Sequence, residues 1–230
     1  MKRFYKDVTV ARTDIGWTVQ LDGRPIKTQG GKPQVLPTET LAEMLAAEWR
    51  SQGQTIDPST FRFRDMADYA LDVVASDPEP VVEKLLGYAE TDTLCFRADP
   101  EEPLYRRQKE IWEPLLTAFE AREGVTLHRV SGVLHKPQAA ASLARLRERL
   151  AGLSAFELAA LEQLTSLAAS LCIGLGALEK DADTDGLWAA ANLEEEWQAD
   201  LWGREEEAEE RRAKRKRDFL AAVEFARVSG

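Results

Sequence analysis

An Asp-Gly pair at the centre of two alternating apolar runs limits how the start of this chain can fold. The segment "GWTVQLDGRPIKT" (16–28) places Asp22 and Gly23 where a two-residue type I′ turn needs two residues with positive φ. Such a hairpin pairs Val19 with Ile26 and fixes which side chains share a face. The predicted inner face is apolar and consists of Trp17, Val19, Leu21 and Ile26.

A change of period follows the hairpin. In "PTETLAEMLAAEW" the apolar residues Leu41, Leu45 and Trp49 recur every four positions, which predicts a helix. Thr38 stands where a helix N-cap is expected. The strands and this helix together predict a small α+β domain over residues 1–63.

Residues 64–230 carry mainly helical patterns. The longest predicted helix spans 154–180 and opens with a capping box, Ser154-x-x-Glu157. Its second half is apolar on all sides, and Gly174 and Gly176 allow neighbouring helices to approach closely. The expected fold is therefore α+β: a small strand-rich N-terminal α+β domain (1–63), followed by a larger helical domain (64–230).

Charge and composition narrow the class of protein. The net charge is −10, which argues against general nucleic-acid binding. Two cysteines without metal-type spacing indicate a reducing compartment. The start of the chain shows no targeting pattern, and the longest apolar run (167–178) is too short to span a bilayer. We expect a monomeric cytoplasmic protein without membrane insertion.

Catalytic chemistry finds little support in the residues. The two histidines, His128 and His135, flank a predicted turn and have no partner pattern for catalysis. No phosphate loop, dinucleotide fingerprint or metal motif occurs, so we predict no enzyme activity, no cofactor and no metal. The alternative is a small-molecule enzyme that uses Glu90 and Asp92, which lie close together in "YAETDTLCFRA".

A basic run, Arg211–Arg217, offers another alternative, a nucleic-acid binder. It directly follows the acidic segment "REEEAEE", and both lie in one predicted helix. Glu207 and Arg211 are spaced i,i+4 in the order that favours helical ion pairs. The pattern therefore favours a solvated helix, and no nucleic-acid partner is predicted.

The stretch "LEEEWQADLWGREEEAEE" (193–210) places two tryptophans among nine carboxylates. If 188–207 is one helix, its residues form two stripes. One stripe, with Leu193, Trp197 and Leu201, is predicted to pack in the core. The other suits either a solvated helix face or aromatic anchors that grip a protein partner. Its members are Trp188, Ala191, Glu195, Gln198 and Trp202.

Several motifs in this order resemble one known family. They are "FYKDVTV", "GWTVQLDGRPIKT", "VLPTETLAEMLAAEW", "IDPSTFRFRDMADYALDVV", "YAETDTLCFR" and "LEEEWQADLWGREEEAEER". Together they are similar to the assembly chaperones that attend the α subunit of the F-type ATP synthase, over about residues 5–210.

The resemblance implies a non-catalytic protein whose partner is the unassembled ATP synthase α subunit. Because the start of the chain shows no presequence pattern, it also implies a bacterial, cytoplasmic member of the family. Such a chaperone would hold new α subunit, prevent its aggregation and release it into the α3β3 head. The resemblance also implies a set of functionally sensitive, partner-binding residues. They are Glu195, Glu196, Gln198, Trp202 and Gly203.

One segment departs from the family pattern. "FRFRDMADYA" is more charged than the family usually is at this place, and its packing at the expected domain junction is therefore open to question. The added charges are Arg62, Arg64, Asp65 and Asp68.

Overall fold

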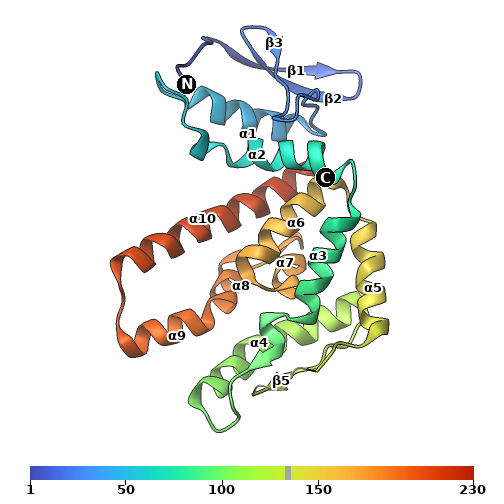
Figure 1. Cartoon of the computed structure of the whole chain (residues 1–230), viewed down its shortest axis with the longest axis vertical. Coiled ribbons are helices and arrows are strands. Elements are labelled where there is room, and N and C mark those ends of the chain that lie inside the picture. Colours follow the sequence, from blue (N-terminus) through green and yellow to red (C-terminus); the bar gives the residue numbers. More distant parts are fainter. Residues whose placement is uncertain (133–135) are drawn as a thin grey trace. The chain divides into compact units, whose positions relative to one another are not determined.

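The computed structural model describes residues 1–132 and 136–230 (Figure 1). The chain divides into two compact units, each built from more than one stretch. Compactness alone does not show where an independently folding domain ends, so the boundary expected after residue 63 stays a prediction. Unit 1 consists of Met1–Pro78, Ser154–Ala160 and Ala221–Gly230, and unit 2 of Glu79–Leu153 and Leu161–Leu220.

Unit 1 contains an antiparallel sheet with the strand order β1-β2-β3. The turn between β2 and β3 has φ values of 49° at Asp22 and 76° at Gly23, as a type I′ turn requires. The N–H of Ile26 donates to the carbonyl of Val19 at 3.0 Å, which confirms the predicted register. The strands are β1 (Val8–Thr13), β2 (Gly16–Leu21) and β3 (Arg24–Pro25).

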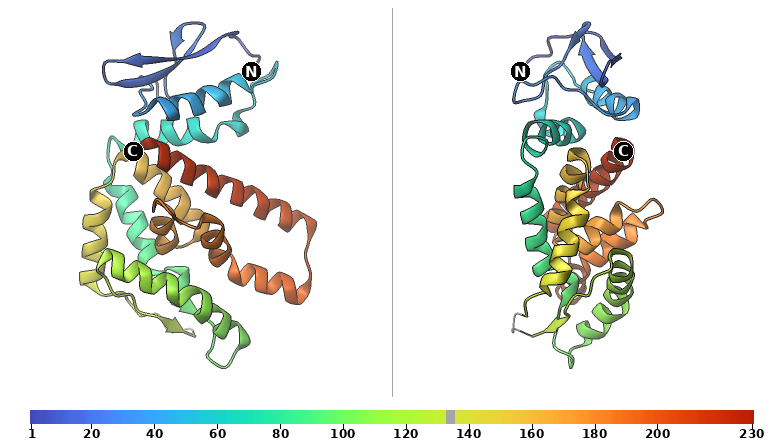
Figure 2. Two further views of the ribbon diagram at one scale, coloured as in Figure 1. Left: turned by 180° about the vertical axis from the view of Figure 1, so that it is seen from behind. Right: turned by 90° about the vertical axis from the view of Figure 1, so that its right-hand side faces the viewer.

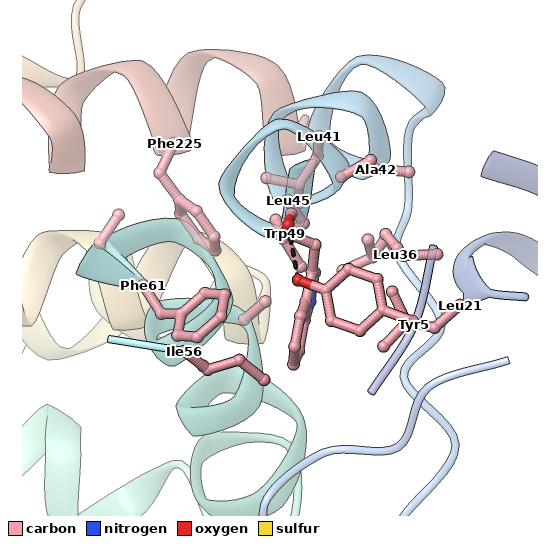
Figure 3. Packing of buried hydrophobic residues seen from close by; sticks show 14 residues of the cluster. Tyr5, Leu21, Leu36, Leu41, Ala42, Leu45, Trp49, Ile56, Phe61 and Phe225 are labelled. Carbon is pink, nitrogen blue, oxygen red and sulfur yellow. Dashed lines mark hydrogen bonds between the residues drawn. The ribbon is translucent and has the colours of Figure 1, made fainter. Parts of the chain in front are cut away.

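The core of unit 1 packs against helix α1 (Glu39–Arg50). Thr38 caps this helix, because its Oγ1 accepts the N–H of Leu41 at 3.2 Å. The hydroxyl of Tyr5 donates to the carbonyl of Trp49 at 2.6 Å, so the one polar atom of that ring is satisfied inside the core (Figure 3). Residues from the start and the end of the chain meet here: Tyr5, Val19, Leu21, Leu36, Leu41, Leu45, Trp49, Phe61 and Phe225.

The charged segment after α1 forms η1 (Pro58–Thr60), α2 (Arg62–Tyr69) and a π-helical turn, η2 (Ala70–Val74). Its carboxylates hold the loop that follows the hairpin. Asp68 accepts the N–H of Gln29 at 3.1 Å, and Asp72 accepts the N–H of Gly30 at 2.7 Å. Burial raises the pKa of Asp68. The unusual charge at Asp68 therefore has a packing role inside unit 1.

Unit 2 is mainly helical, and Figure 2 shows its elements from two further sides. A pair of short parallel strands, β4 and β5, joins two of its loops. Two of the helices, α6 and α10, begin or end in unit 1. The elements from residue 79 onward are α3 (Glu79–Glu90), η3 (Thr93–Cys95), β4 (Phe96–Arg97), α4 (Pro103–Glu123), β5 (Val130–Ser131), α5 (Ala140–Ala151), α6 (Ala155–Ala168), α7 (Leu171–Ala177), α8 (Thr184–Ala191), α9 (Leu193–Trp202) and α10 (Glu206–Ser229).

The single helix predicted over 154–180 is wrong, because the chain breaks between α6 and α7. Ala169 has a left-handed φ of 49°. Its carbonyl accepts the N–H of Thr93 at 3.2 Å and the Thr93 hydroxyl at 2.8 Å instead of continuing the helix. Ser170 then starts α7, since its Oγ accepts the N–H of Ile173 at 3.1 Å.

The predicted fold class, a strand-bearing N-terminal part followed by a larger helical part, is confirmed. Among the residues that the structure describes, no helix combines the length and apolarity needed to cross a membrane.

Candidate partner-binding surface

The acidic stretch that carries the predicted site lies on α9, after a break that the sequence did not reveal. The chain was expected to be helical from 188 to 207, but α8 ends at Ala191 and α9 starts at Leu193. The break falls at Asn192, whose φ of −105° and ψ of 16° leave the helical range and whose side-chain amide donates to the carbonyl of Trp188 at 2.8 Å.

The break separates the two tryptophans of the expected binding stripe. Trp188 is 4% exposed and packs against Phe219, with ring centroids 5.3 Å apart. Trp202 is 80% exposed. The two rings therefore do not belong to one surface: Trp188 is a core residue, and Trp202 alone is available to a partner.

The stripe expected to pack in the core also divides. Leu193 is buried, but Leu201 is 62% exposed, so its predicted burial is wrong. Leu201 and Trp202 together form an exposed pair at the end of α9, which we call the apolar tip. Gly203 ends the helix with φ 98° and ψ 164°, a conformation that favours glycine. This glycine fixes where the tip ends and the chain turns.

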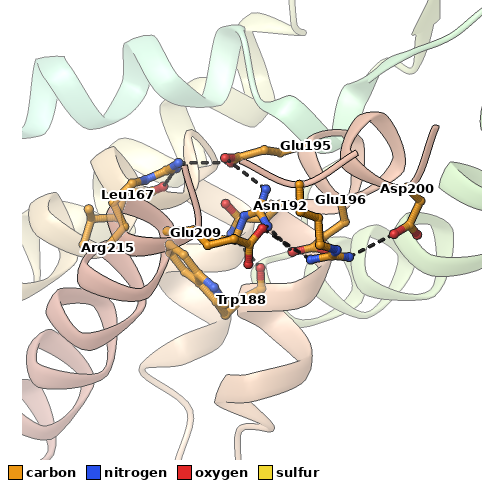
Figure 4. A network of polar contacts seen from close by, with 10 residues as sticks. Leu167, Trp188, Asn192, Glu195, Glu196, Asp200, Glu209 and Arg215 are labelled. Atoms are coloured by element: carbon orange, nitrogen blue, oxygen red, sulfur yellow. Dashed lines mark hydrogen bonds and ion pairs between the residues drawn. The ribbon is translucent and has the colours of Figure 1, made fainter. Parts of the chain in front are cut away.

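Glu195 and Glu196 hold basic residues of the following segment (Figure 4). Glu195 pairs with Arg212 at 3.4 Å and with Arg215 at 3.2 Å. Glu196 pairs with Arg212 at 3.0 Å and with Arg204 at 2.8 Å. Both side chains are about 40% exposed, although each of their carboxylate oxygens already pairs with an arginine. They tie α9 to α10 through partly exposed ion pairs.

The remaining predicted residue, Gln198, is exposed on α9. Among the residues that the structure describes, its side-chain amide has no hydrogen-bond partner and is available to another molecule. The preceding Glu194 differs, because it accepts a hydrogen bond from the amide of Gln108 at 2.6 Å and burial raises its pKa. The start of helix α9 is thus held by a hydrogen bond to Gln108, whereas the side chains near its end are exposed.

The basic run, Arg211–Arg217, is largely used inside unit 2. The guanidinium of Arg215 donates to the carbonyl of Leu167 at 3.0 Å and lies 5.6 Å from the centre of the Trp188 ring. Lys216 pairs with Asp185 at 2.7 Å. These partners were missed by the sequence analysis, although opposite charges on adjacent helices were a readable signal. The run therefore offers few free cations to a nucleic acid.

Glu90 and Asp92 do not share one solvent-open site, because Glu90 is exposed and Asp92 is buried. Asp92 is fully buried and accepts the N–H groups of Leu94 at 3.1 Å and Cys172 at 3.0 Å. Burial raises the pKa of Asp92 and raises that of the Cys95 thiol to about 12. These groups are held as structural links between η3 and α7.

Metal and histidine chemistry gain no support from the geometry. Over residues 1–132 and 136–230, no three His, Cys, Asp or Glu side chains gather in a way that could hold a metal ion. His128 is half-buried, and its backbone N–H donates to the side chain of Gln138 at 2.7 Å. His135 lies outside the described residues.

Comparison with known proteins identifies this chain as a member of a class of chaperones. The profile of the family described as ATP12 chaperone protein matches residues 2–120. The mitochondrial protein atp12 of Schizosaccharomyces pombe is 29% identical over an alignment 222 residues long, which covers 91% of this chain and 76% of that protein. The solved structure of Atp12 from Paracoccus denitrificans is 36% identical with a TM-score of 0.93, covering 100% of this chain and 98% of that one. The Atu1473 protein of Agrobacterium tumefaciens is 38% identical with a TM-score of 0.93, covering 99% and 85%.

This chain belongs to the ATP12 chaperone family. Its function is accordingly that of a chaperone in ATP synthase assembly, and its partner is a protein of that assembly.

Proposed function

We propose that this chain binds the unassembled α subunit of the F-type ATP synthase and prevents its aggregation before α3β3 assembly. In this proposal it is a non-catalytic, monomeric protein of the bacterial cytoplasm. The observation that carries the proposal is the apolar tip of α9, where Trp202 is 80% exposed within an acidic helix of an ATP12-family chain.

The tip has the composition of a binding hot spot. Tryptophan is enriched among residues whose truncation strongly weakens a complex, because its large ring is desolvated on binding. Leu201 enlarges the apolar area, and Gln198 adds an open hydrogen-bonding group on the same helix. The partly exposed carboxylates of Glu195 and Glu196 suit basic groups of the α subunit, which would compete with the arginines of this chain. The contact with Trp202 would supply affinity, and the carboxylates of Glu195 and Glu196 would orient the partner.

The test is co-expression of a tagged chain with the α subunit, followed by measurement of captured α and of aggregated α. Trp202→Ala should weaken binding by at least ~2 kcal/mol, about thirtyfold. Its melting temperature should change little, because substitutions at exposed positions usually alter stability by less than about 0.5 kcal/mol. Trp202→Phe should retain part of the binding.

Val73→Ala provides the matched control, because Val73 is also an exposed apolar residue, at 48%, but lies on η2 of unit 1. It should capture α normally. Capture of α at full strength by Trp202→Ala would place the binding surface elsewhere. Failure of the unmodified chain to capture α at all would refute the proposed function itself.

A further inference from the structure

The outer edge of β1 has backbone groups that no other strand uses. β1 is the first strand in the order β1-β2-β3, so one of its two edges has no neighbour. In an antiparallel pair, successive residues direct their N–H and C=O groups alternately toward the partner strand and away from it.

The hydrogen bonds of β2 show which backbone groups of β1 point outward. Trp17 exchanges hydrogen bonds with Leu36, at 2.9 and 2.7 Å, and Val19 accepts one from Ile26, so the backbone groups of both residues point away from β1. Their partners across the pair are Arg12 and Val10. The N–H and C=O groups of Val10 and Arg12 must therefore point to the open side of the sheet.

An independent contact confirms this direction. Val8 belongs to the same alternate set as Val10 and Arg12, and its carbonyl accepts a hydrogen bond from Nε of Arg50 at 3.3 Å on that side. No described residue hydrogen-bonds to the backbone of Val10 or Arg12 on that side. Two donors and two acceptors thus lie in a row with strand spacing.

We propose that this edge takes up an extended segment of the unassembled α subunit by antiparallel strand addition, a recognition mode in which backbone hydrogen bonds supply affinity. The inference rests on the proposed function for the identity of the partner. It adds a second binding surface, on unit 1, to the tip of α9 on unit 2.

The side chains beside the edge define the segment that fits. Val8 and Val10 are partly buried against the core of unit 1, so the added strand should carry apolar residues on that face. Arg12 lies on the same face, 5.9 Å from the centre of the Trp17 ring, and forms no ion pair with any residue that the structure describes. A carboxylate of the partner opposite Arg12 would complete the site.

Charge disfavours a second copy of this chain as the occupant. Antiparallel self-pairing centred on Val10 would set Arg12 of one copy opposite Val8 of the other, next to Arg50. The guanidinium groups of Arg12 and Arg50 would then lie near each other, and two nearby like charges repel. An acidic segment of a different protein meets no such repulsion.

Hydrogen exchange on the captured complex tests the inference directly. Binding should slow exchange of the Val10 and Arg12 amides by about tenfold or more, because these amides change from solvent-exposed to hydrogen-bonded. The amides of β2 are already bonded in the free chain and serve as the internal control. Unchanged exchange at Val10 and Arg12 in a complex that does form overturns the inference alone. If no α subunit is captured, the inference fails together with the proposed function.

A proline scan separates backbone from side-chain effects. Arg12→Pro removes the outward N–H, and proline is tolerated on an edge where the N–H faces solvent. Arg12→Ala removes the same side chain but keeps the N–H. Arg12→Pro should bind α about two- to tenfold more weakly than Arg12→Ala, the effect of one net hydrogen bond. Ala11→Pro should instead lower the melting temperature, because the Ala11 N–H faces β2. Equal binding by Arg12→Pro and Arg12→Ala, both folded, would refute strand addition.

Discussion

Alanine substitutions at two glycines of α7 measure how closely this helix approaches its neighbours. A methyl group at Gly174 would lie 2.4 Å from Oγ1 of Thr165 and 3.0 Å from Cδ1 of Leu161. A methyl group at Gly176 would meet Leu187 at 3.6 Å, an ordinary contact distance. The two positions share one helix and differ in the space around them.

The expected magnitude follows from two opposing effects. Alanine is favoured over glycine inside a helix by about 1 kcal/mol, and this gain is similar at both positions. At Gly174 overpacking costs about 1–3 kcal/mol, because Thr165 is fully buried and its branched side chain has restricted χ1 rotamers. The helix-forming gain cancels in the comparison, so Gly174→Ala should be about 1–3 kcal/mol less stable than Gly176→Ala. Gly174→Leu should be less stable still.

Thermal unfolding of the two variants checks this difference. For a chain of this size 1 kcal/mol shifts the melting temperature by about 2–4 °C. Thr165→Ala added to Gly174→Ala should recover part of the loss, since it removes the closest atom. If Gly174→Ala melts at or above the temperature of Gly176→Ala, the close approach of α6 and α7 is refuted.

Two further predictions concern ion pairs. Burial opposes ionisation of Glu120, but hydrogen bonds from Arg129 and from a backbone N–H outweigh it and lower the pKa of Glu120 below its usual 4.5. The stabilisation from this pair is therefore present above about pH 4.5 and is lost as the pH falls through the lowered pKa. Urea unfolding of the unmodified chain and of Arg129→Met checks this. The difference in their free energies of unfolding should be large at pH 7 and shrink below pH 4.5. Glu195→Lys should lower the free energy of unfolding by about 1–2 kcal/mol, because it sets a cation beside Arg212 and Arg215. Glu195→Gln should lower it less. Equal melting temperatures for the two variants would show that these pairs are not formed in solution.

The elements that the sequence predicted well are those set by neighbouring residues. The register of the hairpin follows from Asp22 and Gly23, whose conformations depend on the turn itself. The start of α1 follows from Thr38, which bonds a backbone group three residues away. Such rules need no knowledge of the rest of the chain.

The break between α6 and α7 could not be predicted, because its cause lies far along the chain. The carbonyl of Ala169 leaves α6 to bond Thr93, and Asp92 takes the N–H of Cys172 at the start of α7. The apolar pattern of 154–180 is satisfied equally by one long helix or by two buried ones. Only the tertiary partner selects between them.

The sequence indicated which residues belong to the candidate site, but it did not indicate which of them are exposed. The sequence singled out Trp188 and Trp202 alike, yet one is buried and the other open, because the turn at Asn192 reorients the helix between them. Glu195 was considered as a solvated residue, and its pairing with Arg212 and Arg215 depends on a helix that comes later in the chain.

The discontinuity of unit 1 constrains the order in which the protein can mature on the ribosome. Phe225 is fully buried in the core of that unit, and the carbonyl of Val228 accepts the hydroxyl of Thr38. Translation at the usual rate delivers these residues roughly ten to thirty seconds after Met1–Pro78 has been made. During that interval the nascent sheet and α1 have an incomplete core. A premature stop codon before Phe225 would consequently damage the first part of the protein, and the truncated product would be exposed to proteolysis.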